Sequence, residues 1–301
     1  MCGITGYISL NNSIEPAQLK KATSLLQHRG PDAEGFYFSD NNKIGLGHRR
    51  LSILDLSTAA NQPMHSSNGR YIIVFNGEVY NYKELAETLS DKGAGLTTTS
   101  DTEVILQLFC ERGVDCFKEL NGMFALAIYD IQKNILTLAR DHAGIKPLFI
   151  YCDDDEFIFA SELKAIQSIK KRELGINRKA IAYFLHLGFI PHPFTIYNKT
   201  EKFPAAHYLQ LDINASNFNC INSQMLPFWS LEAKIEKETV KDEKTAKARL
   251  KNLLFDSVQK QLVSDVPIGT FLSGGIDSSL VTAIACQVSN KKINSYSIAI
   301  D

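Results

Sequence analysis

Met1-Cys2-Gly3-Ile4-Thr5-Gly6 begins the chain, and the interpretation of every later segment depends on this stretch. Cysteine is small enough for the initiator methionine to be trimmed, and trimming would make Cys2 the terminal residue. Its thiol would then lie beside its own α-amine, which titrates near neutrality and can act as the base that activates the thiol. Gly3 and Gly6 permit close backbone approach in an expected strand. The stretch therefore predicts either a terminal thiol nucleophile or an ordinary buried cysteine.

The composition is that of an ordinary soluble globular protein with room for two domains. The chain has 301 residues, of which 45% are hydrophobic and 22% charged. A formal net charge of -1 gives no basic excess for nucleic acid or an anionic membrane, so we expect neither partner. No apolar stretch is long enough to span a bilayer, and no positively charged leader precedes the first strand. The cysteines form no C-x-x-C pair, which argues against zinc or a disulfide framework and favours a cytoplasmic location: Cys2, Cys110, Cys116, Cys152, Cys220 and Cys286.

The first part of the chain predicts strands that come in runs, separated by helices. This order favours a layered α+β sandwich over a βαβ alternation. Asn76-Gly77 directly follows a β-branched strand and is a typical turn dipeptide, and Ser100 or Asp101 is placed to cap a helix. The last four expected strands predict an antiparallel meander. Strands are expected at 2–10, 36–38, 44–54, 71–75, 124–130, 135–140, 148–152 and 157–160, and helices at 16–27, 81–90 and 103–111.

The second part begins after a region that prolines interrupt. Residues 191–240 suit a connecting region, and the Lys- and Glu-rich segment 234–251 suits a solvated helix face. From about residue 241 a second domain is expected. There a strand at 268–272, a glycine-rich turn, a helix at 280–288 and a strand at 293–300 form a βαβ unit.

The turn of this βαβ unit, Ser273-Gly274-Gly275-Ile276-Asp277-Ser278-Ser279, has features of a phosphate-binding loop. It lacks the spacing and the lysine of a Walker A loop. Its glycines still allow backbone amides to face an anion, and its three hydroxyls add donors. Asp277 would repel phosphate unless it binds Mg²⁺, for which carboxylate oxygens are suited. The alternative is a tight strand-to-helix turn capped by serine.

Five residues of the first part suggest a site for an amino acid. Asn76 and Gly77 can place a side-chain amide and a backbone amide side by side, which is how an oxyanion hole is built. Arg50 carries a planar fork that suits a carboxylate, whereas Arg49 should point to the opposite face of the strand. Glu78 and Asp101 offer charges for an ammonium group. Singly, these residues are equally compatible with a hairpin turn and surface charges.

Together with Cys2, these residues give the chain a clear resemblance to glutamine-dependent asparagine synthetases. The matching stretches run in order over the whole chain: Met1-Cys2-Gly3-Ile4, Arg50-Leu51-Ser52-Ile53, Gln62-Pro63-Met64, Phe75-Asn76-Gly77-Glu78-Val79-Tyr80-Asn81, Asp101-Thr102-Glu103, Asn121-Gly122-Met123-Phe124-Ala125, Arg140-Asp141, Lys146-Pro147-Leu148, Ala160-Ser161-Glu162 and the 273–279 loop.

The resemblance implies that residues 2–190 form a class II glutamine amidotransferase domain, a four-layer αββα sandwich of the N-terminal nucleophile hydrolase type. Cys2 would be the nucleophile, Asn76 and Gly77 the oxyanion donors, and Arg50 the ligand of the glutamine carboxylate. Glu78 and Asp101 would bind the glutamine ammonium. The pocket would also be lined by Leu51, Ser52, Ile53 and Leu54.

For residues 241–301 the resemblance implies the beginning of a pyrophosphatase-type synthetase domain with a parallel sheet. ATP and Mg²⁺, the latter at Asp277, would activate aspartate as β-aspartyl-AMP, and ammonia from glutamine would displace AMP. A single βαβ unit cannot cover both faces of its sheet, so we expect this chain to hydrolyse glutamine without completing the ATP-dependent half. No tightly bound organic cofactor is implied, and a homodimer is left open. The nucleotide would be bound by Leu272, Ser273, Gly274, Gly275, Asp277, Ser278, Ser279 and Ile298.

Two other hypotheses stay open. One is a related amidotransferase that delivers ammonia to another acceptor, such as a sugar in polysaccharide biosynthesis. The 273–279 loop argues against phosphoribosyl and hexose-phosphate amidotransferases, and Cys2 argues against β-lactam synthetases. The other hypothesis is a non-catalytic module that keeps the fold, in which case Met1 would be retained.

Overall fold

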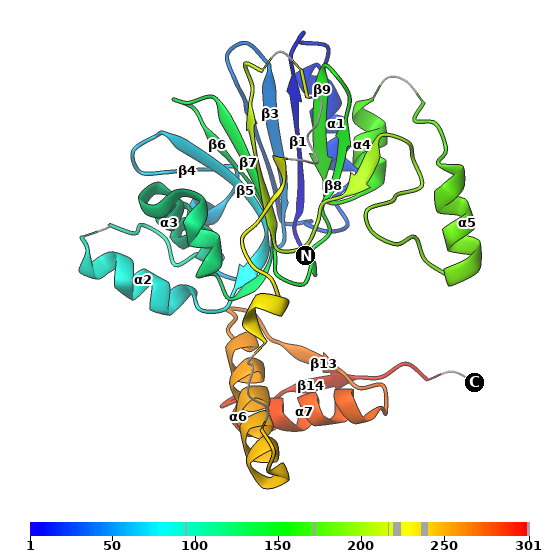
Figure 1. The fold of residues 1–301 in the computed structure, drawn as a ribbon. Coiled ribbons are helices and arrows are strands. Elements are labelled where there is room, and N and C mark those ends of the chain that lie inside the picture. The colour runs from blue at the N-terminus through cyan, green and yellow to red at the C-terminus, as the bar shows by residue number, and fades with distance from the viewer. Residues whose placement is uncertain (94, 171–172, 216, 219–223, 236–239, 300–301) are drawn as a thin grey trace. The chain divides into compact units, whose positions relative to one another are not determined.

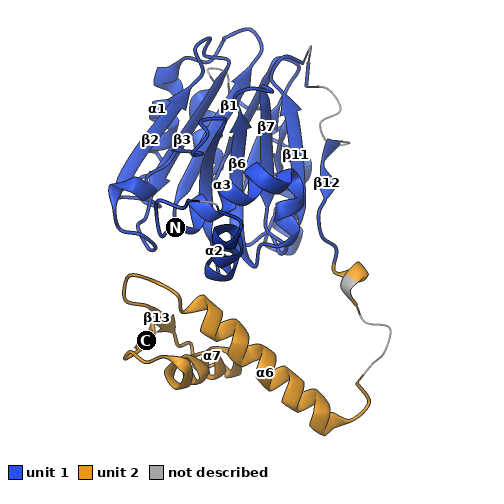
Figure 2. Ribbon diagram, turned by 90° about the vertical axis from the view of Figure 1, so that its left-hand side faces the viewer, with its two compact units in different colours: residues 1–230 blue, residues 231–301 orange. Residues whose placement is uncertain are grey.

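The protein consists of two compact units, residues 1–230 and 231–301 (Figure 2). The structure, a computed structural model, describes residues 1–93, 95–170, 173–215, 217–218, 224–235 and 240–299. Cys220 lies outside the described residues. The other five cysteines are free thiols. None of the described helices is both long and apolar enough to cross a membrane.

The first unit contains two six-stranded antiparallel sheets (Figure 1). One sheet has the order β10-β8-β9-β1-β3-β2, so the first strand lies near its centre. Its strands are β1 (Gly3–Ser9), β2 (Ala33–Phe38), β3 (Ile44–Arg50), β8 (Phe149–Cys152), β9 (Glu156–Ala160) and β10 (Thr200–Lys202).

The other sheet has the order β12-β11-β7-β6-β5-β4, and the long β5 pairs with β6 along its whole length. Its strands are β4 (Met64–His65), β5 (Tyr71–Val79), β6 (Gly122–Asp130), β7 (Ile135–Arg140), β11 (His207–Asp212) and β12 (Leu226–Pro227).

The core lies between the two sheets, and helices cover their outer faces. Along β1, Ile4 and Ile8 face the other sheet while Tyr7 faces a helical layer, which is why every residue of this strand is buried. Helices α1 (Pro16–Ser24) and α4 (Leu163–Ile169) pack on the first sheet, α3 (Asp101–Arg112) packs beside β5, and α2 (Tyr82–Asp91) packs against α3. The predicted four-layer α+β sandwich is therefore confirmed.

Several predicted elements need correction. Asn76 and Gly77 do not form a turn, because β5 continues through both residues to Val79 in unbroken register with β6. β3 ends at Arg50, so the expected strand to residue 54 is four residues too long. The four strands from β6 to β9 are no meander, since β6 and β7 belong to one sheet and β8 and β9 to the other.

The region expected to be a connection also contributes to the first unit. β10, β11 and β12 all fall between residues 191 and 230, and each pairs with a strand of one of the two sheets. Helix α5 (Arg178–Leu187) precedes them. Short 3-10 turns occur at Thr58–Ala60, Gly113–Lys118 and Glu232–Lys234.

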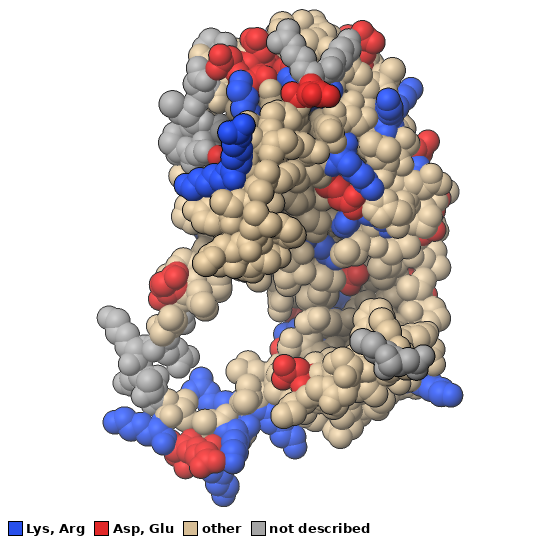
Figure 3. Space-filling model, turned by 90° about the vertical axis from the view of Figure 1, so that its right-hand side faces the viewer, with Lys and Arg blue, Asp and Glu red and all other residues tan. Residues whose placement is uncertain are grey.

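The second unit is a βαβ arrangement, as predicted. β13 (Gly269–Phe271) and β14 (Asn294–Tyr296) pair in parallel, and α7 (Ile276–Val288) connects them. The preceding helix α6 (Glu243–Gln261) has no buried residue, which fits a solvated helix. Figure 3 shows basic and acidic side chains close to one another on one face of the molecule, in keeping with the balanced net charge.

Candidate active site

A small cavity of about 40 Å³ lies where the inward faces of both sheets end. The side chains of Ile4 on β1, Leu46 on β3 and Val74 on β5 belong to the core between the sheets. Continuing the two-residue alternation of each strand places Cys2, Arg50 and Asn76 on the same inward faces. The cavity is lined by Met1, Cys2, Arg50, Leu51, Ile53, Leu54, Ala60, Gln62, Phe75, Asn76, Gly77, Glu78, Ser100, Asp101, Thr102 and Lys146.

Nearly all the residues predicted for the glutamine site line this cavity. The exception is Ser52, whose backbone amide donates instead to the carboxylate of Asp32 at 2.7 Å. The other nine come from four separate segments of the chain: the N-terminus, the end of β3 with the loop after it, the end of β5 and the start of α3.

The Cys2 thiol is held against the loop that follows β3. Its Sγ accepts a hydrogen bond from the Leu51 amide at 3.4 Å, and its carbonyl accepts one from Arg29 Nε at 2.9 Å. Burial raises the pKa of the thiol, so the resting group is protonated and needs a base. Burial lowers the pKa of the adjacent Met1 α-amine, and an α-amine on Cys2 itself could act as that base only after removal of Met1.

No histidine is among the described residues that line this cavity, so none is placed to act as the base. His48 is the inward-facing residue before Arg50 on β3, but it is fully buried and its Nε2 lies 3.1 Å from the Phe75 carbonyl oxygen. Burial lowers its pKa to about 3. His48 therefore stays neutral near pH 7 and is a structural residue of the buried interior.

Asn76 carries an amide side chain with no partner in the interior of the protein. It is 0% exposed, and neither its Nδ2 nor its Oδ1 forms a hydrogen bond with any described residue. A buried amide without partners costs about 1–3 kcal/mol. Because this side chain lines the cavity beside Cys2, its free N–H groups are available to a ligand.

The backbone amide of Gly77 points away from β6, as the amides of Phe75 and Val79 do. The amides of Phe75 and Val79 point away from β6, since they donate to the side chains of Gln62 at 2.6 Å and Asp101 at 3.0 Å. Amide directions alternate along a strand, so the Gly77 amide between them points the same way. Asn76 and Gly77 thus supply two donors to one cavity, as an oxyanion hole requires.

Two carboxylates stand at the cavity wall. Asp101 follows the helix cap Ser100, whose hydroxyl accepts from the Thr102 amide at 3.1 Å. Burial raises the pKa of Asp101 to about 7, with Glu78 adding to the effect, and burial also raises the pKa of Glu78. Both groups would be stabilised in their charged form by a bound cation.

Arg50 has the predicted location, but its fork is already engaged. Its Nη1 donates to the Ser57 carbonyl and to Asn61 Oδ1, each at 2.7 Å, and its Nη2 donates to the carbonyls of Leu54 and Asp55. The guanidinium therefore holds the loop after β3. Arg49 points to the opposite face, as predicted, and pairs with Glu34 at 2.7 Å.

Two further residues of the cavity were not predicted to belong to the site. Gln62 braces it, because its Nε2 donates to Thr102 Oγ1 at 3.2 Å while its Oε1 accepts from the Phe75 amide. Lys146, itself buried in the turn that follows β7, brings an ammonium group to the wall. The one signal for them in the sequence is that they lie in two of the stretches that resemble the family, Gln62-Pro63-Met64 and Lys146-Pro147-Leu148.

In the second unit, the glycine-rich loop joins β13 to α7 as expected. Gly274 adopts a left-handed φ of 80°, and Gly275 is the N-cap of α7. Ser273 and Ser278 hydrogen-bond to each other through their hydroxyls at 3.0 Å. The loop therefore forms a tight turn whose following helix terminus is exposed.

The remaining residues predicted for the nucleotide lie close to this turn or near its strands. Leu272 is linked to β14 by its amide, which donates to the Tyr296 carbonyl at 2.8 Å, and Ile298 beyond β14 is exposed. Asp277 lies exposed in the first turn of α7, and the described residues contain no group of three metal-binding side chains. A single carboxylate fits Mg²⁺ only when phosphate oxygens complete the ligand set.

Two family models match the chain. The glutamine amidotransferase domain matches residues 1–222, and the asparagine synthase family matches residues 249–301. The first match covers most of the chain.

Several relatives that match almost the whole chain are named as asparagine synthetases. A putative glutamine-hydrolysing asparagine synthetase 2 of Methanocaldococcus jannaschii is 38% identical over 100% of this chain and 60% of its own length. Asparagine synthetase B of Escherichia coli is 34% identical, with 97% and 46% covered. The chain thus spans about half the length of the curated relatives it matches.

Among solved structures, a glutamine phosphoribosylpyrophosphate amidotransferase of B. subtilis shares the fold. Its TM-score is 0.54 at 18% identity, with 98% of this chain and 65% of that chain covered. The low identity limits the comparison to the fold.

Proposed function

The chain belongs to the glutamine amidotransferase domain family, and from this premise we propose that its first unit hydrolyses glutamine to glutamate and ammonia with Cys2 as the nucleophile. The observation that carries the proposal is the buried amide of Asn76. It has no partner among the described residues, and it lies in the wall of the cavity that Cys2 also lines. An amide kept without partners beside a thiol suits an anion that forms only during reaction.

The first chemical step is attack of the thiol on the side-chain amide carbon of glutamine. The α-amine of Cys2 takes the thiol proton, the new C–S bond forms, and the carbonyl oxygen becomes an oxyanion. Asn76 Nδ2 and the Gly77 amide donate to that oxyanion. The amine then returns the proton to the leaving nitrogen, the C–N bond breaks, and ammonia leaves a thioester that water hydrolyses to glutamate.

The charged groups of the cavity orient the substrate. Glu78 and Asp101 bind its ammonium group, and this binding favours their ionised forms despite burial. Arg50 binds the carboxylate after exchanging loop carbonyls for substrate oxygens, because the loop acceptors currently occupy its terminal nitrogens. Loop movement is thus part of substrate binding.

Removal of Met1 is required for this mechanism. Met1 blocks the α-amine of Cys2, and it also lines the cavity while its own surface is 55% exposed. A cavity of about 40 Å³ holds a few water molecules rather than an amino acid. Trimming frees the base and enlarges the site in one event.

For the second unit we propose the nucleotide-binding part of an asparagine synthetase. Ammonia would amidate aspartate activated by ATP, which fits the asparagine synthase match and the names of the relatives. The loop from Ser273 to Ser279 would hold phosphates at the α7 N-terminus, between Leu272 and Ile298. Asp277 would hold Mg²⁺ together with the phosphate oxygens.

Glutamate release by purified protein tests the glutaminase proposal. Wild-type protein should release glutamate and lack Met1 by mass spectrometry, whereas Cys2→Ala should be inactive. Cys286→Ala, which removes an exposed thiol of the second unit, is the matched control and should stay active. Equal release by wild type and Cys2→Ala would refute the assignment.

Binding of Mg²⁺-ATP tests the second unit. Asp277→Asn should weaken binding and reduce its dependence on Mg²⁺, whereas Asp256→Asn, which changes an exposed pair with Lys260 on α6, should not. Equal affinities of wild type and Asp277→Asn would remove Asp277 from the site.

A further inference from the structure

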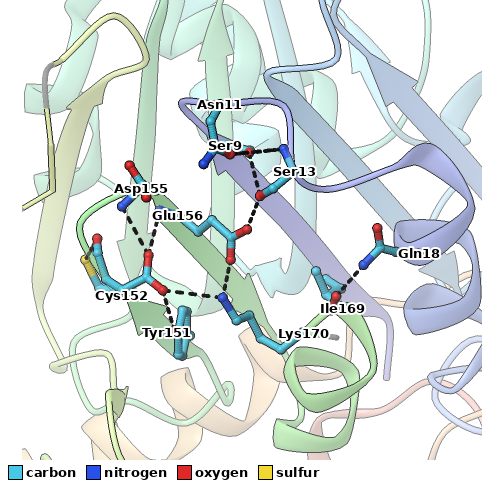
Figure 4. Close-up of polar contacts among 11 residues, drawn as sticks. Ser9, Asn11, Ser13, Gln18, Tyr151, Cys152, Asp155, Glu156, Ile169 and Lys170 are labelled. Atoms are coloured by element: carbon cyan, nitrogen blue, oxygen red, sulfur yellow. Dashed lines mark hydrogen bonds and ion pairs between the residues drawn. The ribbon is translucent and has the colours of Figure 1, made fainter. Parts of the chain in front are cut away.

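The first unit contains a buried lysine, Lys146, and a half-buried lysine, Lys170, whose surroundings differ. Lys170 lies between β8, β9 and α4 and forms ion pairs with Asp153 at 3.3 Å and with Glu156 (Figure 4). Hydrogen bonding to Glu156 raises its pKa although burial acts in the opposite direction. Lys170 is therefore a satisfied structural cation.

Lys146, in contrast, has an ammonium group without a partner. It is 3% exposed, and its Nζ forms no hydrogen bond and no ion pair with any residue that the structure describes. Its backbone is fixed, because its amide donates to Asp141 Oδ2 at 3.0 Å and its carbonyl accepts from Arg140 Nε at 2.7 Å. The turn thus holds an unpaired positive charge at the cavity wall.

The acidic groups nearest to Lys146 are either engaged or separated from it. Asp141 accepts backbone amides with both oxygens, including that of Phe124 at 3.1 Å. Glu78 on β5 attracts Lys146 but lies beyond ion-pair distance. The remaining charged neighbour, Arg29 before β2, is also positive and pairs with Glu162 at 3.1 Å.

The N-terminal residues of the chain line the same cavity as Lys146. Both Cys2 and Lys146 line the cavity, and the charge of Lys146 acts on the Cys2 thiol and on the α-amine of Met1, the residue whose removal would expose the α-amine of Cys2. An unpaired ammonium group in the wall of a cavity that also holds a nucleophile points to a functional role.

We propose that Lys146 is a positioning residue of the glutaminase site, whose ammonium group repels a proton from the α-amine of Cys2 and attracts the negative charge that forms on the Cys2 sulfur. The inference rests on the proposed glutaminase function. The same positive charge serves both partners, because the base must be neutral while the nucleophile must become an anion. The other side-chain cations near Cys2 are engaged, since Arg50 is committed to its loop and Arg29 pairs with Glu162, and the Met1 ammonium is lost when Met1 is removed.

The pKa directions agree with this role. Lys146 opposes the effect of burial on the Cys2 thiol, whose pKa burial raises. It adds to the effect of burial on the α-amine of Met1, whose pKa burial lowers, and the α-amine of Cys2 becomes the terminal amine once Met1 is removed. Burial lowers the pKa of Lys146 itself, and the charge of Glu78 works against that change.

Cys2 reactivity tests the inference without glutamine. The rate of iodoacetamide alkylation at Cys2, followed by peptide mass spectrometry across pH, should have its midpoint raised by about one pH unit in Lys146→Met, the size expected for one charge at a partly buried site. Lys146→Arg should restore the wild-type midpoint. Lys118→Met, which removes an exposed lysine paired with Asp115, should leave it unchanged.

The pH profile of glutamine hydrolysis gives the second readout. The acidic limb of kcat/KM should move to higher pH by about one unit in Lys146→Met, with KM for glutamine nearly unchanged, because the amine would hold its proton more tightly. If neither the alkylation midpoint nor the acidic limb moves in Lys146→Met, the inference is overturned. If Lys146 were only structural, Lys146→Met would lower the melting temperature without moving either midpoint, and that outcome also overturns it.

Failure of the two proposals can be told apart. Cys2-independent glutamate release contradicts the glutaminase assignment, whatever Lys146 does. A shifted alkylation midpoint in Lys146→Met would still establish the electrostatic coupling to Cys2. If the wild type is active and Lys146→Met has the same pH profile, the proposed role of Lys146 is rejected and the glutaminase proposal stands.

Discussion

Replacing Asn76 with leucine should make the protein more stable and nearly inactive. Leucine has the same branching and the same number of non-hydrogen side-chain atoms as asparagine, so Asn76→Leu removes the polar atoms without leaving a cavity. Both amide atoms of Asn76 are buried without partners among the described residues. Relief of that penalty should stabilise the fold by about 2 kcal/mol.

The expected effects are large enough to measure. For a unit of 230 residues, about 2 kcal/mol corresponds to a rise in melting temperature of about 4–8 °C. Loss of one oxyanion donor should lower kcat for glutamine hydrolysis by a factor of about 10²–10³. Calorimetry and a glutamate assay on the same preparation provide both values.

Asn81→Leu is the matched control. Asn81 donates to the Glu119 carbonyl and accepts from the Asn121 amide, each at 2.9 Å, so the same replacement breaks two hydrogen bonds. It should destabilise the fold by about 1–3 kcal/mol and leave kcat largely intact. The reasoning fails if Asn76→Leu is destabilised like this control, or if it keeps near wild-type kcat.

Two other predictions concern β5 and α3. Gly77→Ala should destabilise the fold by about 1–3 kcal/mol and impair hydrolysis, because a Cβ there would lie 2.4 Å from the Met123 carbonyl oxygen on β6. Urea unfolding measures the loss of stability, and Gly95→Ala is the control because a Cβ at Gly95 would meet open space. Glutamine binding to Cys2→Ala should weaken as pH falls below about 7, since protonated Asp101 no longer attracts the substrate ammonium. Calorimetric titrations should show that Asp101→Asn binds weakly at every pH, and an equally steep pH dependence in that variant would contradict the assignment.

Asn76-Gly77 illustrates how a correct site residue can be predicted with the wrong backbone. Asn-Gly is a typical turn dipeptide, yet here it lies inside a strand. The glycine serves close approach instead of a positive φ, because the β6 backbone occupies the space where its Cβ would be. Only the pairing of β5 with β6, which is non-local, distinguishes the two uses.

Other features of the site depend on distances that local sequence does not encode. Arg50 could be assigned to the correct face from strand alternation, whereas its engagement by the loop of residues 54–61 depends on how that loop folds back. Lys146 is 144 positions from Cys2 in the sequence, and its lack of a partner emerges only once β7 and the turn after it are in place.

The position of the site follows from where the apolar alternation stops. β1 and β3 pair with Gly3 opposite Arg49, so one further step sets Cys2 opposite Arg50. On β5 the apolar residues Ile72 and Val74 give way to Asn76 and Glu78 on the same face. Asn76 replaces a core residue at this edge without a partner among the described residues, so it weakens the fold while it supplies donors to the cavity. The stability gained in Asn76→Leu is therefore a direct measure of what the fold gives up to hold its oxyanion donor in place.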